Sequence, residues 1–244
     1  MDCILLAAGY ATRLYPLTEH TPKALLKLGS KTILDRVMDK LEEIEQLNNV
    51  YVVTNHRFAA LFTDWAKAYG GKKPVKVLDD GTTNNDNRLG AIGDMQYVID
   101  REHLEDELFI LASDNIFHFS LLGMVDMYYE KGCDLISAHY VAEKTTLQKL
   151  GVVELDAHNK VLGFEEKPQE PKSHYGVPPF YFYRKSTVPL IKKYLEEGNN
   201  PDAPGHFIPW LITQTDVYAY TFDELIIDIG TPESYYEAQE LFQD

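Results

Sequence analysis

The sequence contains little cysteine and no long apolar run. Its 244 residues include two cysteines, Cys3 and Cys133, both inside apolar stretches and without metal-ligand spacing. We therefore expect buried thiols and a reducing, cytoplasmic environment. The apolar run near the N-terminus is too short to cross a bilayer, and no basic leader precedes it. These features argue against a membrane protein and a secreted one.

Basic charge is also scarce. The chain has 23 Lys and Arg against 38 Asp and Glu, a formal net charge of -15. A surface that binds nucleic acid through many phosphates needs more cations than this, so we expect no nucleic-acid partner. A small anionic ligand needs only a few local cations and backbone amides, and the composition allows one.

Apolar blocks of strand length alternate with helical patterns in the first half of the sequence. Strands are predicted at 3–7, 50–53, 75–78 and 108–112, and helices at 32–47, 59–69 and 89–99. A strand that returns after each helix predicts an α/β fold with a doubly wound, mostly parallel, Rossmann-like sheet. Ligands of such sheets bind beyond the carboxyl ends of the strands.

The second half has many strands and few helices. Strands are predicted at 135–141, 151–155, 161–164, 180–183 and 217–221, and helices at 185–197 and 232–242. This pattern favours a mixed or antiparallel extension of the parallel core. Because low-complexity linkers and internal repeats are absent from the sequence, we expect one domain over residues 1–244.

A loop of small residues and cations follows the first predicted strand. Its members of interest are Ala7, Ala8, Gly9, Thr12 and Arg13, with Lys23 further along. Amides near a glycine can cradle oxyanions, an arginine fork suits a terminal phosphate, and a lysine supplies a point charge. A plain strand exit with solvated basic residues accounts equally well for the glycine spacing, which matches neither a Walker loop nor a dinucleotide fingerprint.

Two aspartates follow apolar strand patterns. Asp114 comes after 108–112, and Asp228 comes after Leu225-Ile226-Ile227. Carboxylates at two strand ends can hold Mg²⁺ together with substrate phosphates. A turn at Asp114 and a helix cap at Asp228 are the alternatives, and the residues alone leave both open.

The segment from Leu6 to Thr18, followed by Pro22-Lys23-Ala24-Leu25-Leu26, resembles the signature of sugar-1-phosphate nucleotidyltransferases. The resemblance covers nearly the whole chain through further blocks at 89–93, 113–117, 164–168 and 227–234, in the family's order. Asp-Asn-Ile-Phe at 114–117 is similar to glucose-1-phosphate thymidylyltransferases in particular. Ala11 and Pro179 depart from the pattern, because the family usually has glycine at each position.

The resemblance implies an enzyme that transfers a nucleotidyl group from a nucleoside triphosphate to a sugar 1-phosphate and releases pyrophosphate. It favours dTTP or UTP and glucose 1-phosphate, and it implies Mg²⁺ as cofactor, held by Asp114 and Asp228. We expect a nucleotide-binding half over about 1–133 and a sugar-phosphate-binding half over about 134–244. A homo-oligomer is left open.

The resemblance also implies roles for individual residues. Arg13, Lys23 and Asp114 are expected to be catalytic, and Glu166 and Lys167 to bind the sugar phosphate. The nucleotide is expected to contact Ala7, Ala8, Gly9, Thr12, Arg13, Gly90 and Asp114. The Asn84 amide is a further candidate for a base contact, although an asparagine-rich turn explains that residue at least as well.

The sequence leaves two alternative functions open. One is a CTP-dependent cytidylyltransferase that acts on phosphocholine or another small alcohol phosphate, because Pro179 falls in the segment expected to shape the acceptor pocket. The other is a catalytically silent nucleotide-binding regulator. Retention of both aspartates and of both loop cations, Arg13 and Lys23, disfavours the regulator.

Overall fold

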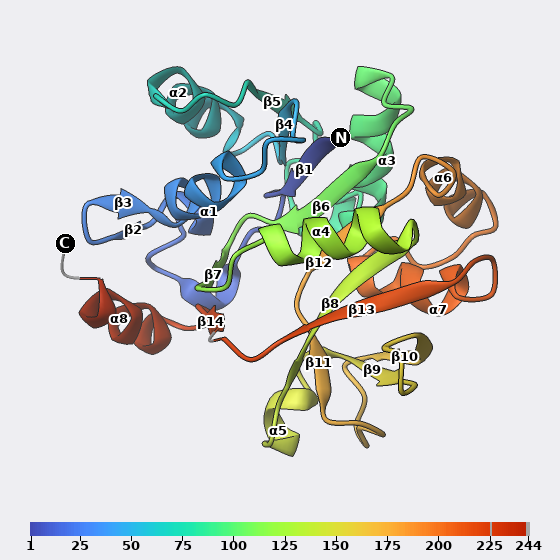
Figure 1. The fold of residues 1–244 in the computed structure, drawn as a ribbon. Helices are drawn as coiled ribbons and strands as arrows, with labels where there is room; N and C mark the ends of the chain where they lie inside the picture. Colours follow the sequence, from blue (N-terminus) through green and yellow to red (C-terminus); the bar gives the residue numbers. More distant parts are fainter. Residues whose placement is uncertain (225, 243–244) are drawn as a thin grey trace. The chain divides into compact units, whose positions relative to one another are not determined.

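The computed structural model describes residues 1–224 and 226–242, with only the backbone described at Asp228 (Figure 1). Two compact units each collect separate stretches of the chain. The glycine-loop unit contains residues 2–88 and 112–121 and the chain from 224 on, and the mixed-sheet unit contains Met1, 89–111 and 122–223. The division into halves near residue 133 stays a prediction, since compactness does not show which ligand each part binds.

The glycine-loop unit is built on three parallel strands in the order β1, β4, β5. Their bounds are Asp2–Leu6, Val50–Thr54 and Val75–Asp79. Every residue of β4 is buried, as expected for a parallel strand that is covered on both faces. Helices α1 and α2 follow β1 and β4 in the chain, at Ile33–Glu42 and Ala59–Ala68.

Helix α1 begins with a capping box and buries one face. The Asp35 backbone N–H donates to Thr32 Oγ1 at 3.0 Å, and the Thr32 N–H donates to Asp35 Oδ2 at 2.8 Å. The prediction of a helix as far as residue 47 was wrong, because α1 ends at Glu42. Beyond that point the Lys73 ammonium donates to the carbonyls of Ile44 and Leu47, which satisfies these groups outside a helix.

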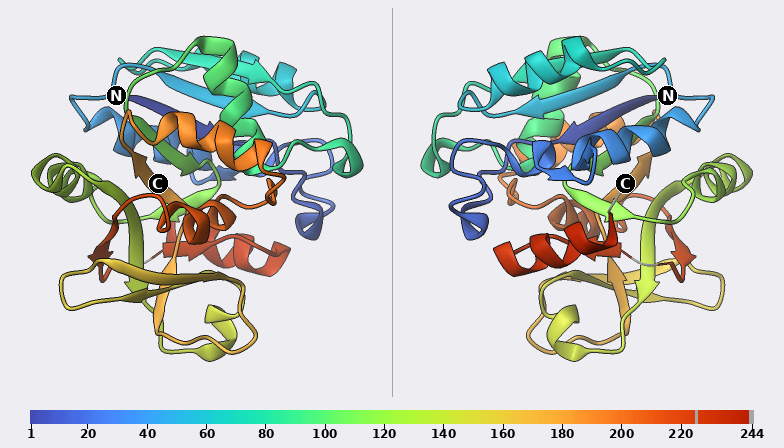
Figure 2. Two further views of the ribbon diagram at one scale, coloured as in Figure 1. Left: turned by 90° about the vertical axis from the view of Figure 1, so that its right-hand side faces the viewer. Right: turned by 90° about the vertical axis from the view of Figure 1, so that its left-hand side faces the viewer.

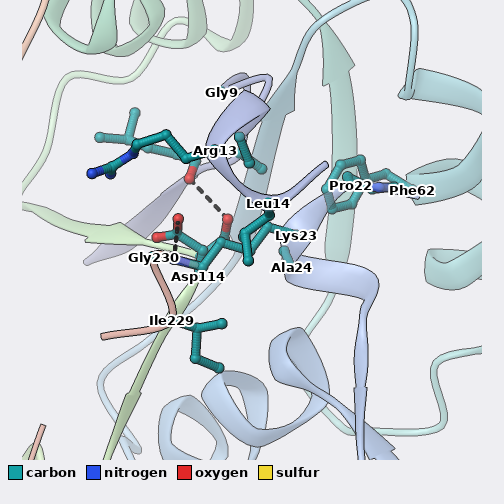
Figure 3. Close-up of a pocket in the computed structure, with 14 residues that line it drawn as sticks. Gly9, Arg13, Leu14, Pro22, Lys23, Ala24, Phe62, Asp114, Ile229 and Gly230 are labelled. Carbon is teal, nitrogen blue, oxygen red and sulfur yellow. Dashed lines mark hydrogen bonds and ion pairs between the residues drawn. The ribbon is translucent and has the colours of Figure 1, made fainter. Parts of the chain in front are cut away.

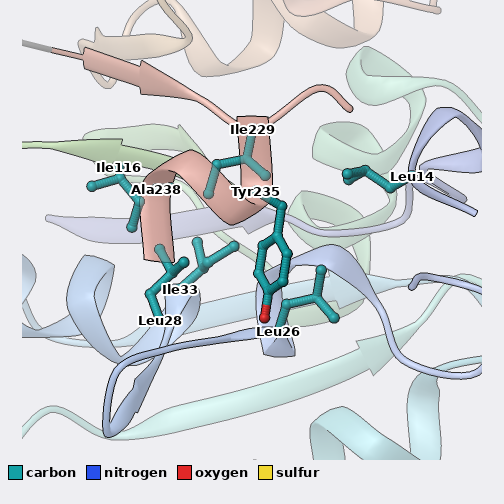
Figure 4. Close-up of a cluster of buried hydrophobic side chains, with 8 residues drawn as sticks. All are labelled: Leu14, Leu26, Leu28, Ile33, Ile116, Ile229, Tyr235 and Ala238. Carbon is teal, nitrogen blue, oxygen red and sulfur yellow. The ribbon is translucent and has the colours of Figure 1, made fainter. Parts of the chain in front are cut away.

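The last part of the glycine-loop unit packs back on its first part. Strands β7 (Asn115–Phe117) and β14 (Ile226–Asp228) form an antiparallel pair, and α8 (Pro232–Leu241) follows. One buried apolar cluster joins these elements to the start of the chain (Figure 4); its members are Leu14, Leu26, Leu28, Ile33, Ile116, Ile229, Tyr235 and Ala238. The Tyr235 hydroxyl also donates to the Lys27 carbonyl at 2.7 Å. Short elements complete the unit: η1 (Thr12–Leu14), η2 (Lys23–Leu25), β2 (Lys27–Leu28), β3 (Lys31–Thr32) and η3 (Asn85–Asn87).

The mixed-sheet unit contains strands in the order β10, β9, β11, β8, β12, β6, with β13 parallel to β8. Its other strand pairs are antiparallel. The strands are β6 (Leu108–Ala112), β8 (Asp134–Tyr140), β9 (Gly151–Leu155), β10 (Val161–Glu166), β11 (Tyr175–Val177), β12 (Phe180–Tyr183) and β13 (Val217–Phe222). The helices are α3 (Ala91–Glu102), α4 (Leu122–Lys131), α5 (Lys144–Leu147), α6 (Val188–Glu196), η4 (Pro204–His206) and α7 (Phe207–Leu211). Helices α3 and α6 pack against each other (Figure 2).

These elements confirm the predicted α/β class, with parallel strands in one unit and a mixed extension in the other. The sequence did not predict α4, α5, α7, β2, β3, β7 or β11, whereas the strand pattern predicted before Asp228 falls in β14. Both thiols are buried, as expected, and burial raises the pKa of Cys3 and of Cys133. Within the described residues, each helix is too short or too polar to cross a membrane.

Candidate active site

The glycine loop leaves β1 on a backbone that is held at both sides. The Leu6 carbonyl accepts from the Ser113 N–H at 3.1 Å and from Ser113 Oγ at 2.9 Å, and Asn55 Nδ2 donates to the Ala8 carbonyl at 2.9 Å. Gly9 is exposed, and a Cβ placed there would meet no atom within 4 Å. Protein packing therefore does not require glycine at this position, and the space in front of it is open to a ligand.

Asn55 and Ser113 were not singled out from the sequence. Both are buried polar residues directly after apolar strands, β4 and β6. Buried polar side chains normally have a hydrogen-bonding task, and a polar residue directly after an apolar strand is the signal that identifies these two. They fix the loop backbone, and Ser113 also lines the pocket beside the loop.

Ala11, which departs from the resemblance described above, has a left-handed backbone, with φ 46° and ψ 43°. Its carbonyl accepts from the buried Thr18 hydroxyl at 2.8 Å and from the Leu14 N–H at 3.0 Å. An L-residue in this region costs roughly 1–2 kcal/mol. The two hydrogen bonds hold the loop in a conformation that glycine would adopt without this cost.

Lys23 and Asp114 form an ion pair beside the loop, with Lys23 Nζ 3.0 Å from Asp114 Oδ2. The lysine side chain is 10% exposed and the aspartate side chain 38% exposed, so the carboxylate is the more accessible partner. Lys23 starts η2, and Asp114 lies between β6 and β7. The fold of one unit thus brings together these two predicted residues, which are far apart in sequence.

A pocket of about 140 Å³ surrounds this pair (Figure 3). The residues that line it include Ala7, Gly9, Arg13, Lys23, Asp114 and Gly230. Pockets for drug-sized ligands span roughly 300–1,000 Å³. The pocket therefore matches the phosphate end of a nucleotide better than a whole nucleoside triphosphate. Ala8 and Thr12 belong to the same loop, and Thr12 is exposed at the start of η1.

The expected Mg²⁺ pair is described in part. In the β7–β14 ladder the backbone of Asp228 lies opposite Asn115, the residue after Asp114. The Asp228 side chain lies outside the described residues. Among the side chains that are described, no three His, Cys, Asp or Glu residues gather as a metal site. Mg²⁺ is usually held by one or two carboxylates with water and substrate phosphates, and the accessible Asp114 carboxylate fits an ion bound in that way.

Asn84 is exposed and engaged in a local turn. Its Oδ1 atom accepts from the Asp86 N–H at 2.9 Å and from the Asn87 N–H at 3.2 Å, and so caps η3. The carbonyl oxygen of the amide therefore has partners within the chain. A base contact by Asn84 stays a prediction, and it involves the amide nitrogen if this turn is kept.

Gly90, in the mixed-sheet unit, is buried and left-handed, with φ 80°. A Cβ at this position would lie 2.5 Å from the Pro201 carbonyl oxygen. The first two amides of α3, at Ala91 and Ile92, donate at 2.9 Å to the carbonyls of Asp202 and Pro201. Contact within the protein is therefore sufficient to require glycine here, and the predicted base contact remains a prediction.

Glu166 and Lys167 lie at the end of β10, in the mixed-sheet unit. Lys167 Nζ is 3.7 Å from Glu166 Oε1, with side-chain exposures of 61% for the lysine and 15% for the glutamate. Lys167 has a left-handed backbone, φ 49°. The pKa of Tyr181 is raised, mainly by burial and further by the charge of Glu166. The glutamate is thus enclosed while the lysine extends into solvent.

Comparisons with known proteins add to this geometry. The profile of a family described as nucleotidyl transferase matches residues 2–244. Over 244 residues the chain is 27% identical to the bifunctional protein GlmU of Methanocaldococcus jannaschii, covering all of this chain and 55% of that protein. Over 261 residues it is 26% identical to a glucose-1-phosphate adenylyltransferase of Shewanella baltica, covering 96% of this chain and 62% of that protein. The chain therefore spans between half and two thirds of the length of these two curated relatives.

A solved structure of a UDP-glucose pyrophosphorylase complexed with UDP-glucose has a similar fold. The TM-score is 0.81 at 19% sequence identity, and the match covers 99% of this chain and 97% of that one. At this identity the likeness concerns the fold alone.

Proposed function

Because the chain belongs to the nucleotidyl transferase family, we propose that it transfers a nucleotidyl group from a nucleoside triphosphate to a sugar 1-phosphate and releases pyrophosphate. The observation that carries the proposal is the Lys23–Asp114 pair beside the open Gly9 loop, with Arg13 lining the same pocket. The name of one relative, a glucose-1-phosphate adenylyltransferase, supports the acceptor class. We favour glucose 1-phosphate with dTTP or UTP, on the likeness of residues 114–117 to thymidylyltransferases.

In the proposed reaction an oxygen of the sugar phosphate attacks the α-phosphorus of the triphosphate in line. A phosphorus–oxygen bond forms there, and the bond to the pyrophosphate oxygen breaks with its electron pair. The attacking oxygen is already ionised at neutral pH, so this step requires no general base. The enzyme must align two polyanions and neutralise their charge.

The residues of the pocket suit that task. Backbone amides of the glycine loop bind phosphate oxygens, and Arg13 and Lys23 counter the charge of the departing pyrophosphate. Lys23 is held by the fold, with its side chain 10% exposed, so its cation is oriented before a substrate arrives. Mg²⁺ held by Asp114, with Asp228 as its second proposed ligand, supplies further charge neutralisation when bound.

The test is a substrate panel read by pyrophosphate release. It combines dTTP, UTP, CTP and ATP with glucose 1-phosphate, other sugar 1-phosphates and phosphocholine, each with Mg²⁺. We expect the highest kcat/KM for glucose 1-phosphate with dTTP or UTP. Fastest release with CTP and phosphocholine would establish the cytidylyltransferase alternative. If calorimetry shows tight nucleotide binding but no pair releases pyrophosphate, the hypothesis of a catalytically silent regulator replaces that of an enzyme.

A further inference from the structure

Residues 200–206, between α6 and α7, are tied at both ends by one tyrosine. The hydroxyl of Tyr194 lies 2.9 Å from the Asn200 carbonyl oxygen and 3.1 Å from the His206 carbonyl oxygen. Tyr194 is 3% exposed, and its ring packs edge-on against Phe207 and Trp210, with centroids 5.3 and 5.7 Å away. A hydroxyl has one proton, so this single donor is shared by the two ends. Both ends of the segment are thereby fixed, and residues 200–206 are called the bracket below.

One side of the bracket covers the start of α3. The carbonyls of Pro201 and Asp202 accept from the first two amides of that helix at 2.9 Å each. The first amides of a helix have no partner within the helix, so these carbonyls satisfy donors that would otherwise need water. Gly90 must lack a side chain because the bracket lies against it.

The other side of the bracket meets the predicted acceptor contact. A Cβ at Gly205 would overlap Glu166 Oε2 and would lie 2.9 Å from Phe164 Cζ. The φ angle of Gly205 lies outside the left-handed region, so glycine is needed here for space and not for backbone conformation. The absent side chain at Gly205 leaves the volume that the largely enclosed Glu166 carboxylate occupies.

We propose that residues 200–206 position Glu166 for the sugar phosphate, with Gly205 as the positioning residue that sets where the carboxylate lies. This inference rests on the proposed function. The closest overlap is with the end of the flexible Glu166 side chain, while the Phe164 ring of β10 lies at 2.9 Å and must give only slightly. A methyl group at Gly205 therefore moves the carboxylate further than it moves β10. Acceptor binding then weakens, whereas the nucleotide pocket of the glycine-loop unit keeps all its residues.

The experiment compares Gly205→Ala with Gly70→Ala by steady-state kinetics on the best substrate pair. Gly70 is a matched control, because a Cβ there would meet no atom within 4 Å. For G205A we expect the KM for the sugar phosphate to rise about 10-fold, with kcat and the KM for the triphosphate changed less than about twofold, as for loss of a uniform binding interaction. G70A should match the wild-type protein in all three constants.

A double-mutant cycle identifies the contact. Glu166→Asp withdraws the carboxylate by one methylene, so adding G205A to E166D should change the sugar-phosphate KM by less than about twofold. If G205A does not fold, Tyr194→Phe serves instead, since it loosens both ends of the bracket and keeps the ring; we expect about a threefold rise of the same KM.

Three results would overturn the inference while the wild-type enzyme is active: an unchanged sugar-phosphate KM in the folded variant, an equal rise of both KM values, or additive effects in the cycle. A wild-type protein that turns over no pair of the panel would instead remove the proposed function, and this inference with it.

Discussion

Two lysine–carboxylate pairs, one in each unit, have opposite patterns of burial. In the Lys23–Asp114 pair the lysine side chain is 10% exposed and the carboxylate 38%. In the Lys167–Glu166 pair the lysine is 61% exposed and the carboxylate 15%. The fold therefore fixes the cation of the first pair and the anion of the second. The exposed member of each pair is the one that can move toward a ligand.

This difference suggests distinct tasks for the two pairs. A fixed cation beside an accessible carboxylate suits phosphates and an ion that must be aligned for a reaction. A fixed carboxylate beside a mobile lysine suits binding, because a carboxylate can accept from sugar hydroxyls while a long side chain follows an anionic group. We therefore expect changes at the first pair to affect turnover, and changes at the second to affect acceptor affinity.

The largest effect is expected for Asp114→Asn. This change removes the accessible charge of the first pair with almost no change in volume. We expect kcat to fall roughly 100- to 1,000-fold, with the thermal unfolding midpoint within about 2 °C of wild type, since roughly 1 kcal/mol corresponds to a few degrees in a protein of this size. Asp126→Asn, an exposed aspartate of α4, is the control and should keep wild-type turnover. Near-normal kcat in D114N would remove Asp114 from the site.

Lysine-to-arginine exchange at both pairs tests the contrast directly. Arginine is longer and planar, so it does not reproduce the enclosed Lys23 ammonium, whereas the exposed Lys167 has room for it. We expect kcat/KM to fall about 100-fold in Lys23→Arg and less than about fivefold in Lys167→Arg. Steady-state kinetics of both variants tests this expectation. An equal fall of kcat/KM in the two variants would show that burial does not distinguish the two lysines.

The smallest effect is expected for Ala11→Gly, which probes the loop next to the first pair. Glycine relieves the left-handed strain at Ala11 but adds freedom to the unfolded chain, so we expect a net gain in unfolding free energy of about 1 kcal/mol or less. Urea unfolding measures it. Ala66→Gly in the interior of α2 is the counterpart and should lose about 1 kcal/mol. A loss in A11G of the same size would contradict the left-handed assignment.

Local sequence patterns predicted the parallel strands, and they predicted that polar residues follow directly where some of these strands end. Val50–Thr54 is an unbroken β-branched and apolar run, and β4 was found within one residue of the predicted bounds. Helix α4 was missed because Leu122–Lys131 contains a glycine and carries aromatic and apolar residues without one clear stripe. The end of α1 was missed because Ile44 and Leu47 remain buried after the helix has ended, which extends the helical periodicity beyond the helix.

The sequence predicted those parts of the candidate site in which the type of side chain determines the chemistry. It did not predict the parts that depend on backbone pairing or on close backbone contact. Arg13, Lys23 and Asp114 were expected at one crevice, and all three line one pocket. The pairing of Asp228 with Asn115 joins segments that no local pattern connects. The sequence also could not show why residue 90 is glycine. The atom that excludes a side chain there is the Pro201 carbonyl oxygen, and Pro201 is far away in the sequence.

The apolar cluster around Leu14 and Ile229 also has a consequence for the timing of assembly. A ribosome makes the glycine loop before it makes Ile229 and Tyr235, which belong to the same buried cluster as Leu14. Contacts between such distant segments form slowly because the intervening chain must first be ordered. A nascent chain therefore carries Arg13 and Lys23 long before Ile229 and Tyr235 complete the apolar cluster that packs against the loop.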